Sequence, residues 1–130
     1  MVMIKTLIVE DSQIYRTSLN NMLRERYPNM DVVESPNGED ALRVISDIIP
    51  DLIFMDISLP GKNGLEITKK IKSMHSEIIV IILTNNDLPE YQEAAYQNGA
   101  NHFLSKSCSA DDILSLVENV HSTCISRHLS

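Results

Sequence analysis

The chain has 130 residues, 43% of them hydrophobic, and carries a formal net charge of -7. This length suffices for one hydrophobic core and is too short for two ordinary domains. The acidic balance argues against a nucleic-acid-binding surface. A phosphate backbone requires a patch of Lys and Arg, and the eleven basic residues form no obvious one.

The cysteines and the start of the chain bear on its cellular compartment. Cys108 and Cys124 have neither the spacing of a disulfide framework nor that of a metal site, which is typical of a reducing compartment. The first residues lack the charged leader and apolar core of a signal peptide, and no apolar stretch reaches the roughly 18 residues of a membrane span. We therefore expect a cytoplasmic protein without a membrane segment.

The first half of the chain alternates predicted strands with predicted helices. Residues 6–9 form a continuous apolar run, typical of a strand covered on both faces, and residues 31–34 form a weaker one. Apolar side chains at helical spacing follow each run: Tyr15, Leu19, Met22 and Leu23 after the first, and Ala41, Leu42, Ile45 and Ile49 after the second. A third strand is predicted at residues 52–55, directly before Asp56.

The second half repeats this alternation, with strands predicted at residues 78–83 and 102–104. Three helical stripes separate or follow the strands: Ile67, Ile71 and Met74; Leu88, Tyr91, Ala94 and Ala95; and Ile113, Leu116, Val117 and Val120. We expect the helical stripes of both halves to pack in the core rather than to bind a cofactor. The stripe that begins at Leu88 has the weakest apolar face, so we expect the loosest helix there. Ser109 and Asp112 form a plausible capping box for the last helix.

Five successive strand-helix units with short connections predict a parallel sheet with right-handed crossovers, hence a doubly wound α/β fold. Residues 124–130 show no clear pattern. We therefore expect the folded domain over residues 1–123, and a tail or the start of a linker over residues 124–130.

Three carboxylates follow predicted strands. Glu10 and Asp11 come directly after the first strand and Asp56 after the third, so they converge if these strands are neighbours. Such crowding is unfavourable unless a cation neutralises it, and oxygen ligands suit Mg²⁺ or Mn²⁺ rather than Zn²⁺. Without Asp56, a helix N-cap beside a first-turn charge explains Glu10 and Asp11 equally well. With Asp56, the metal interpretation is favoured.

Two further polar side chains are expected at the same edge of the sheet. Thr84 ends the fourth apolar run, and Lys106 lies just past the fifth. Singly, such residues are usually a turn residue and a solvated charge. Together with the carboxylates they supply what a phosphoryl group on Asp56 requires: a nucleophile, a divalent cation, a hydrogen-bond donor and a fixed positive charge.

These positions belong to a wider pattern, by which the chain resembles the receiver domain of two-component response regulators over essentially its whole length. The matching motifs are Glu10-Asp11, Met55-Asp56, Leu59-Pro60 with Gly64, Thr84, and Gly99-Ala100 leading to Phe103 and Lys106. The resemblance implies a flavodoxin-like fold, with a five-stranded parallel sheet of order 2-1-3-4-5 and five helices. It also implies transfer of a phosphoryl group to Asp56 from a histidine kinase or a phosphotransfer protein.

The resemblance further implies a metal site for Mg²⁺, with Mn²⁺ as a substitute. Asp11 and Asp56 would be direct ligands, Glu10 would act through water, and the backbone carbonyl of Ser58 would complete the protein ligands.

It also implies a switch. Thr84 would bond a phosphoryl oxygen, Lys106 would pair with the phosphoryl group, and the rearrangement would be coupled to Phe103. The alternative to a switching Phe103 is a ring that stays packed in the core. Phenylalanine has no hydroxyl group that would favour an exposed position.

Four positions bear on how this chain differs from other receivers. Asn85 stands where the family usually has a small residue and could narrow access to Asp56 or bond the phosphoryl group. Ser58 and Asn86 border the attacking water in the family and are expected to tune the phosphoryl lifetime. Ser107 replaces a proline common in receivers. A cis bond before a non-proline residue costs about 2.5 to 4 kcal/mol, so this loop need not share their geometry.

The run from Phe103 to Ser107 is similar to receivers joined to LuxR-type helix-turn-helix domains. We therefore expect a non-enzymatic signalling domain, the receiver part of a transcriptional regulator or a stand-alone receiver that acts through protein contacts. A homodimer formed on phosphorylation is left open, as is a degenerate receiver that is not phosphorylated.

A Mg²⁺-dependent phosphatase is a weaker alternative, because Ser58 stands where haloacid-dehalogenase-type enzymes have a second Asp. A flavodoxin-like mononucleotide carrier is disfavoured, because carboxylates occupy the loops where a phosphate needs backbone donors and glycine.

Overall fold

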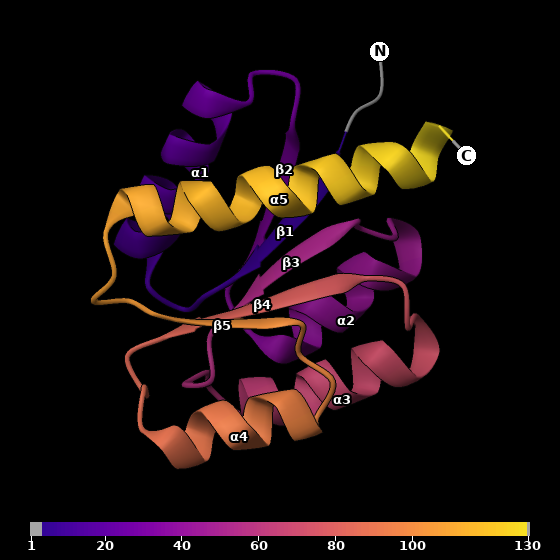
Figure 1. The fold of residues 1–130 in the computed structure, drawn as a ribbon. Helices are drawn as coiled ribbons and strands as arrows, with labels where there is room; N and C mark the ends of the chain where they lie inside the picture. Colours follow the sequence, from indigo (N-terminus) through magenta and orange to yellow (C-terminus); the bar gives the residue numbers. More distant parts are fainter. Residues whose placement is uncertain (1–3, 130) are drawn as a thin grey trace.

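The computed structural model describes residues 4–129, in which strands and helices alternate along the chain (Figure 1). The elements are β1 (Lys5–Val9), α1 (Gln13–Arg26), β2 (Asp31–Ser35), α2 (Gly38–Asp47), β3 (Leu52–Met55), α3 (Gly64–Met74), β4 (Ile79–Thr84), α4 (Pro89–Gln97), β5 (His102–Ser105) and α5 (Ala110–Leu129). The predicted strands and helices are present, with small shifts at their ends except in α5, which extends to Leu129.

The sheet is parallel throughout and has the order β2-β1-β3-β4-β5, which confirms the predicted fold. In its register Val9 lies beside Met55, and Thr84 lies beside Ser105. The backbone N–H of Asp56 continues the ladder by donating to the carbonyl of Val9 at 3.1 Å. The residues that follow these strands therefore gather at one edge of the sheet.

Helices cover both faces of the sheet, α1 and α5 on one side and α2, α3 and α4 on the other (Figure 1). Alternate strand residues point to the two sides: Ile8 and Phe54 pack in the core under α1 and α5, whereas Val9 and Met55 pack in the opposite core. Because both faces are buried, the strands are apolar at nearly every position rather than at every second one.

Side-chain caps explain where several helices begin. Ser12 accepts a hydrogen bond from the backbone of Tyr15 at the start of α1. Asn63 accepts two such bonds at the start of α3. Ser109 and Asp112 exchange hydrogen bonds of 3.1 Å in both directions before α5, so the predicted capping box is confirmed.

Helix α4 matches the prediction of a loosely held helix. Its N-cap residue is Leu88, which has no side-chain acceptor, and Pro89 occupies its first turn. All nine of its residues are described, and Ala95 alone is fully buried. The apolar surface that holds α4 to the sheet is therefore small.

Three residues assigned to the apolar faces of helices lie at the surface instead. Leu88 is 53% exposed because it precedes the first residue of α4. Ile49 is 52% exposed because α2 ends at Asp47, two residues earlier. Met74 is 56% exposed because it is the last residue of α3, where the helix no longer covers the sheet. The prediction that these three side chains face the core was wrong.

Helix α5 continues through the segment in which the sequence shows no clear pattern. Cys124 is 1% exposed and belongs to the core under α1 and α5, and Arg127 donates to the carbonyl of Glu77 at 2.6 Å. The expected irregular tail is therefore helical from residue 124 to residue 129, while residue 130 lies outside the described residues. Neither α5 nor any other helix within residues 4–129 has both the length and the apolar character needed to cross a membrane.

Candidate functional site

The three predicted carboxylates meet at the carboxyl ends of β1 and β3. One carboxylate oxygen from each of Glu10, Asp11 and Asp56 lies within 4.8 Å of the others. Glu10 and Asp56 are only 3% and 5% exposed, whereas Asp11 is exposed. The strand register causes this convergence, because Val9 and Met55 are paired neighbours.

Lys106 joins this cluster from the loop after β5. Its Nζ donates to a carboxylate oxygen of Glu10 and, at 2.9 Å, to Oδ2 of Asp56. The side chain of Lys106 is only 10% exposed. Burial alone would lower the pKa of Lys106, but the hydrogen bonds to the two carboxylates outweigh burial and raise it. The ammonium therefore stays charged in the buried site.

Glu10 is held from several sides. The backbone N–H of Ser12 donates to Glu10 Oε2 at 2.9 Å, and Arg16 donates to the Glu10 carbonyl at 2.7 Å. Burial raises the pKa of Glu10, and the nearby charge of Asp56 adds to this effect, although hydrogen bonds from Lys106 and Ser12 act in the opposite direction. A bound cation would favour the ionised form of this carboxylate.

The two carboxylate oxygens of Asp56 have different partners. Thr84, which is fully buried, donates from Oγ1 to Asp56 Oδ1 at 2.6 Å, and the backbone N–H of Ser58 lies 3.2 Å from the same oxygen. Lys106 bonds the other oxygen. A hydroxyl, an amide and an ammonium thus converge on one carboxylate, as the sequence predicted for Thr84 and Lys106. Such donors stabilise negative charge that develops during a reaction.

Gly64 lets the chain pass close to the backbone of Asp56. A Cβ atom added to Gly64 would lie 1.9 Å from the carbonyl oxygen of Asp56, a distance too short for any real Cβ contact. The N–H of Gly64 also bonds the carbonyl of Ile57 at 2.9 Å. The motif position therefore has a steric reason: only glycine fits where α3 begins against the end of β3.

Phe103 lies in β5 and is half-buried, packed against the core beneath α2, α3 and α4. The structure shows a packed ring. The loop after β5 is fixed by hydrogen bonds, since Ser105 Oγ donates to Asp87 at 2.9 Å and accepts from the N–H of Ser107 at 3.1 Å. No peptide bond within residues 4–129 is cis, and the bond before Ser107 is therefore trans.

The loops after β3 and β4 are joined by a side-chain hydrogen bond that sequence patterns did not reveal. The amide of Asn86 donates to the hydroxyl of Ser58, and the N–H of Asn86 donates to Thr84 Oγ1 at 3.2 Å. Asn85 is exposed. Ser58 and Asn86 thus form a bridge next to Asp56.

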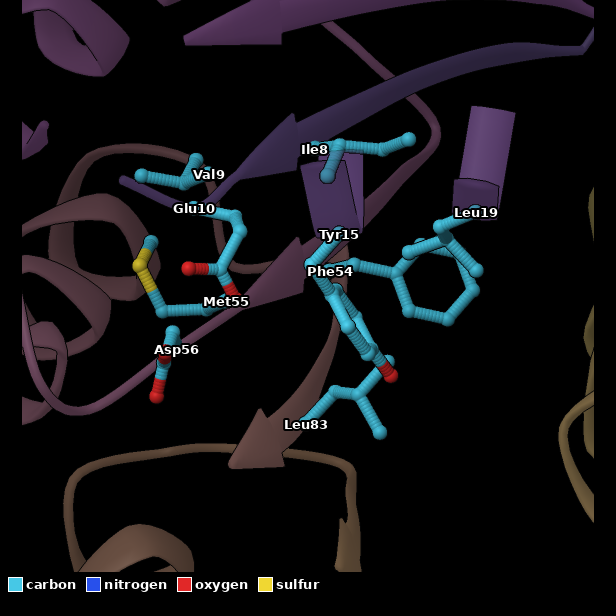
Figure 2. A pocket seen from close by; sticks show the side chains of 9 residues that line it. All are labelled: Ile8, Val9, Glu10, Tyr15, Leu19, Phe54, Met55, Asp56 and Leu83. Carbon is cyan, nitrogen blue, oxygen red and sulfur yellow. The ribbon is translucent and has the colours of Figure 1, made fainter. Parts of the chain in front are cut away.

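A second feature missed from the sequence is the position of Tyr15. Figure 2 shows its ring beside Phe54 and Leu83, in a cavity that Glu10 and Asp56 also line. Nζ of Lys106 lies 4.4 Å from the centre of that ring. The apolar stripe of α1 correctly indicated that Tyr15 faces inward, but gave no sign of a contact with a residue 91 positions later in the chain.

The donor chemistry of the cluster fits a hard divalent cation. Glu10, Asp11 and Asp56 offer carboxylate oxygens within a short distance of one another, and Asp11 is open to solvent, so that bound water could complete the coordination. Mg²⁺ favours such sites, which combine a few carboxylates with water. The residues present therefore fit the predicted magnesium site.

Comparison with known sequences places the chain in one family. The family model described as the response regulator receiver domain matches residues 6–118. The transcriptional regulatory protein LnrK of Bacillus subtilis (strain 168) is 36% identical over 121 residues, which cover 92% of this chain and 54% of LnrK. The response regulator UvrY of Escherichia coli (strain K12) is 31% identical over 120 residues, 92% of this chain and 55% of UvrY. The chain thus spans about half the length of these curated relatives.

Solved structures agree with this assignment. A CheY-like receiver domain protein from Methanospirillum hungatei JF-1 superposes with a TM-score of 0.89 over 97% of this chain and 99% of that protein; at 20% identity this likeness shows the shared fold. A LuxR-family DNA-binding response regulator from Staphylococcus aureus is 27% identical, with a TM-score of 0.83 over 90% of this chain and 98% of that chain. The chain therefore belongs to the response regulator receiver domain family, with LuxR-family regulators among its relatives.

Proposed function

We propose that this receiver domain is a phosphorylation-dependent switch in the cytoplasm, whose Asp56 accepts a phosphoryl group from a histidine kinase or a phosphotransfer protein. The observation that supports this most strongly is the surrounding of Asp56. Its buried carboxylate lies beside Glu10 and Asp11 and is bonded by both Thr84 and Lys106. Receivers of this family are signalling domains rather than classical enzymes.

In the proposed reaction a carboxylate oxygen of Asp56 attacks the phosphorus atom of the donor. The new bond gives an aspartyl phosphate, while the bond between phosphorus and the donor atom breaks and the donor keeps the electron pair. Bound Mg²⁺ would neutralise phosphoryl oxygens, with Asp11 and Asp56 as direct ligands, Glu10 acting through water, and the carbonyl of Ser58 as a further ligand.

Thr84 and Lys106 would stabilise the product. Thr84 Oγ1 already donates to Asp56, so a phosphoryl oxygen on Asp56 can take over as its acceptor. The ammonium of Lys106 would follow the added negative charge. Because Thr84 ends β4 and Lys106 follows β5, this rearrangement acts on the loops around α4 and, through β5, on Phe103. Those surfaces would then change their affinity for partners.

The bridge between Ser58 and Asn86 is proposed to tune how long the phosphoryl group persists. Both residues lie beside Asp56, so their side chains limit how water reaches the phosphorus atom. The exposed Asn85 would act on the same space by its size and its capacity for hydrogen bonds.

The output is proposed to be transcriptional, because LnrK is named a transcriptional regulatory protein and the chain covers only about half of it. The receiver would then extend beyond residue 123, because α5 continues and Cys124 is still buried in the core, and a linker would begin after these last turns of α5. A receiver that acts alone through protein contacts is the alternative. A homodimer that forms on phosphorylation is a further proposal, which the mass of the complex in solution would test with and without the phosphodonor.

The central experiment is phosphorylation with acetyl phosphate and Mg²⁺, followed by intact-protein mass spectrometry. We expect one alkali-labile phosphoryl adduct, none in Asp56→Asn, and a normal adduct in Asp47→Asn, which changes an exposed carboxylate at the end of α2. An adduct that persists in Asp56→Asn would refute the assignment. Repeated turnover of a generic phosphate ester would instead show a phosphatase.

A further inference from the structure

The aromatic ring of Tyr15 lies against the buried ammonium of Lys106. Nζ of Lys106 is 4.4 Å from the ring centre, and the Lys106 side chain is 10% exposed. Tyr15 itself is half-buried in α1, and Figure 2 shows its ring in the same cavity as Glu10 and Asp56. The ring therefore belongs to the immediate surroundings of the site rather than to the distant core.

The face of an aromatic ring attracts a cation, and the attraction is strongest where water is excluded. An ammonium has three N–H donors, and Lys106 directs two contacts to Glu10 and Asp56. The ring of Tyr15 supplies an additional attractive surface that accepts no proton and carries no formal charge. The ring can therefore hold the ammonium in place, whereas a third carboxylate in this position would draw it away from Asp56.

The ring is itself fixed in place. The N–H of Tyr15 bonds the Ser12 cap at the start of α1, and the next residue, Arg16, bonds the carbonyl of Glu10. The first turn of α1 is thereby tied to the end of β1, on which the acidic cluster is built. A shift of Tyr15 would require this turn to move.

We propose that Tyr15 is a positioning residue for phosphoryl transfer to Asp56, acting through Lys106. The inference rests on the proposed function. When a cation binds near Glu10, the attraction between the Glu10 carboxylate and the Lys106 ammonium becomes much weaker. The ring face then keeps the ammonium next to Asp56, where the incoming phosphoryl group requires a positive charge.

Two substitutions separate the ring from the hydroxyl. Tyr15→Phe keeps the ring face, whereas Tyr15→Leu keeps an apolar side chain that can pack against Phe54 but has no ring. We expect Tyr15→Phe to be phosphorylated by acetyl phosphate within about twofold of the wild-type rate, and Tyr15→Leu to be slower by about three- to tenfold. Equal rates in all three proteins, or an equal loss in both variants, would overturn the role of the ring face.

Metal affinity distinguishes positioning from general damage. The chain contains no tryptophan, so Mg²⁺ binding is best followed by the amide signals of Glu10 and Asp56 in heteronuclear NMR. Tyr15→Leu should bind Mg²⁺ as tightly as wild type or more tightly, because the carboxylates remain and a competing ammonium is held less firmly. A loss of Mg²⁺ affinity that parallels the loss of rate would show that Tyr15 only supports the fold.

A graded series covers the case in which Tyr15→Leu does not fold. Phenylalanine analogues with an increasing number of ring fluorines, introduced at position 15, keep the ring shape while weakening the negative face. Phosphorylation should slow with each fluorine, and a flat series would refute the inference even if the wild type is phosphorylated normally. A wild-type protein that takes no phosphoryl group would refute the proposed function instead.

Discussion

Replacing Gly64 with alanine tests the close contact between α3 and the backbone of Asp56. The added Cβ would lie 1.9 Å from the carbonyl oxygen of Asp56 and 2.8 Å from its carbonyl carbon, whereas real Cβ contacts are not shorter than 3.0 Å. The two segments must therefore move apart by about 1.1 Å. The obstructing atoms are backbone atoms, so no side-chain rotation relieves the clash.

The expected effects follow from that displacement. Because the clash is with backbone atoms, we expect an overpacking cost of about 3 kcal/mol, the upper end of its usual range. The helix gains at most about 1 kcal/mol from alanine, which leaves a loss of about 2 kcal/mol. For a domain of this size the melting temperature should fall by about 8 °C. Asp56 is held by Thr84 at 2.6 Å and by Lys106 at 2.9 Å, so a shift of this size should slow phosphorylation on the order of 10- to 100-fold.

Thermal unfolding and acetyl phosphate labelling at a temperature where every variant is folded measure both effects. Gly61→Ala is the matched control, because Gly61 has a φ of 79° and nothing within 4 Å of an added Cβ. It should lose about 1 kcal/mol through backbone strain alone and keep the wild-type rate. If Gly64→Ala had the same melting temperature and the same phosphorylation rate as the wild type, the close approach of α3 to the backbone of Asp56 would be refuted.

Three other predictions concern the metal, the loop bridge and pH. Saturating Mg²⁺ should raise the melting temperature of the wild type, because the cation binds the folded state alone, and Asp11→Asn should lose at least half of the increase; equal increases would remove Asp11 from the metal site. Asn86→Ala and Ser58→Ala each break the same hydrogen bond and should shorten the half-life of the phosphoryl group on Asp56 by about two- to tenfold, as followed by loss of the adduct. Changes in opposite directions would contradict the bridge. Burial lowers the pKa of His102 below its ordinary value of 6.5, so the unfolded state binds more protons just below that pH. The free energy of unfolding, from urea titrations, should therefore fall as the pH drops below 6.5, and the fall should be smaller in His102→Gln.

Parallel strand order made the site predictable from the sequence. A polar residue that follows an apolar strand lies at the carboxyl edge of the sheet. Because all strands are parallel, the residues that follow them lie at the same edge, independently of how the helices pack. Glu10, Asp11, Asp56, Thr84 and Lys106 were all identified by this rule, and the structure brings them together.

Contacts between segments distant in sequence were not predictable in this way. Helical periodicity predicted that Tyr15 faces inward. It does not indicate which distant residue contacts the ring, here Lys106. Helix ends were a second source of error, because the periodicity that includes Ile49 and Met74 continues where the helix no longer covers the sheet. The opposite occurred in α5, where Cys124 follows Val117 and Val120 at helical spacing and extends a stripe that the sequence interpretation ended too early.

The buried end of α5 makes Cys124 a chemical reporter of that helix. Burial raises the pKa of the Cys124 thiol to about 11, and the side chain is 1% exposed, so a thiol reagent near neutral pH should reach it only when the last turns of α5 detach. Cys108 is half-exposed and would be modified first in the native protein. A Cys108→Ser variant would therefore leave one thiol whose rate of alkylation measures how often α5 opens, and comparing that rate before and after addition of acetyl phosphate would show whether phosphorylation loosens the C-terminal turns.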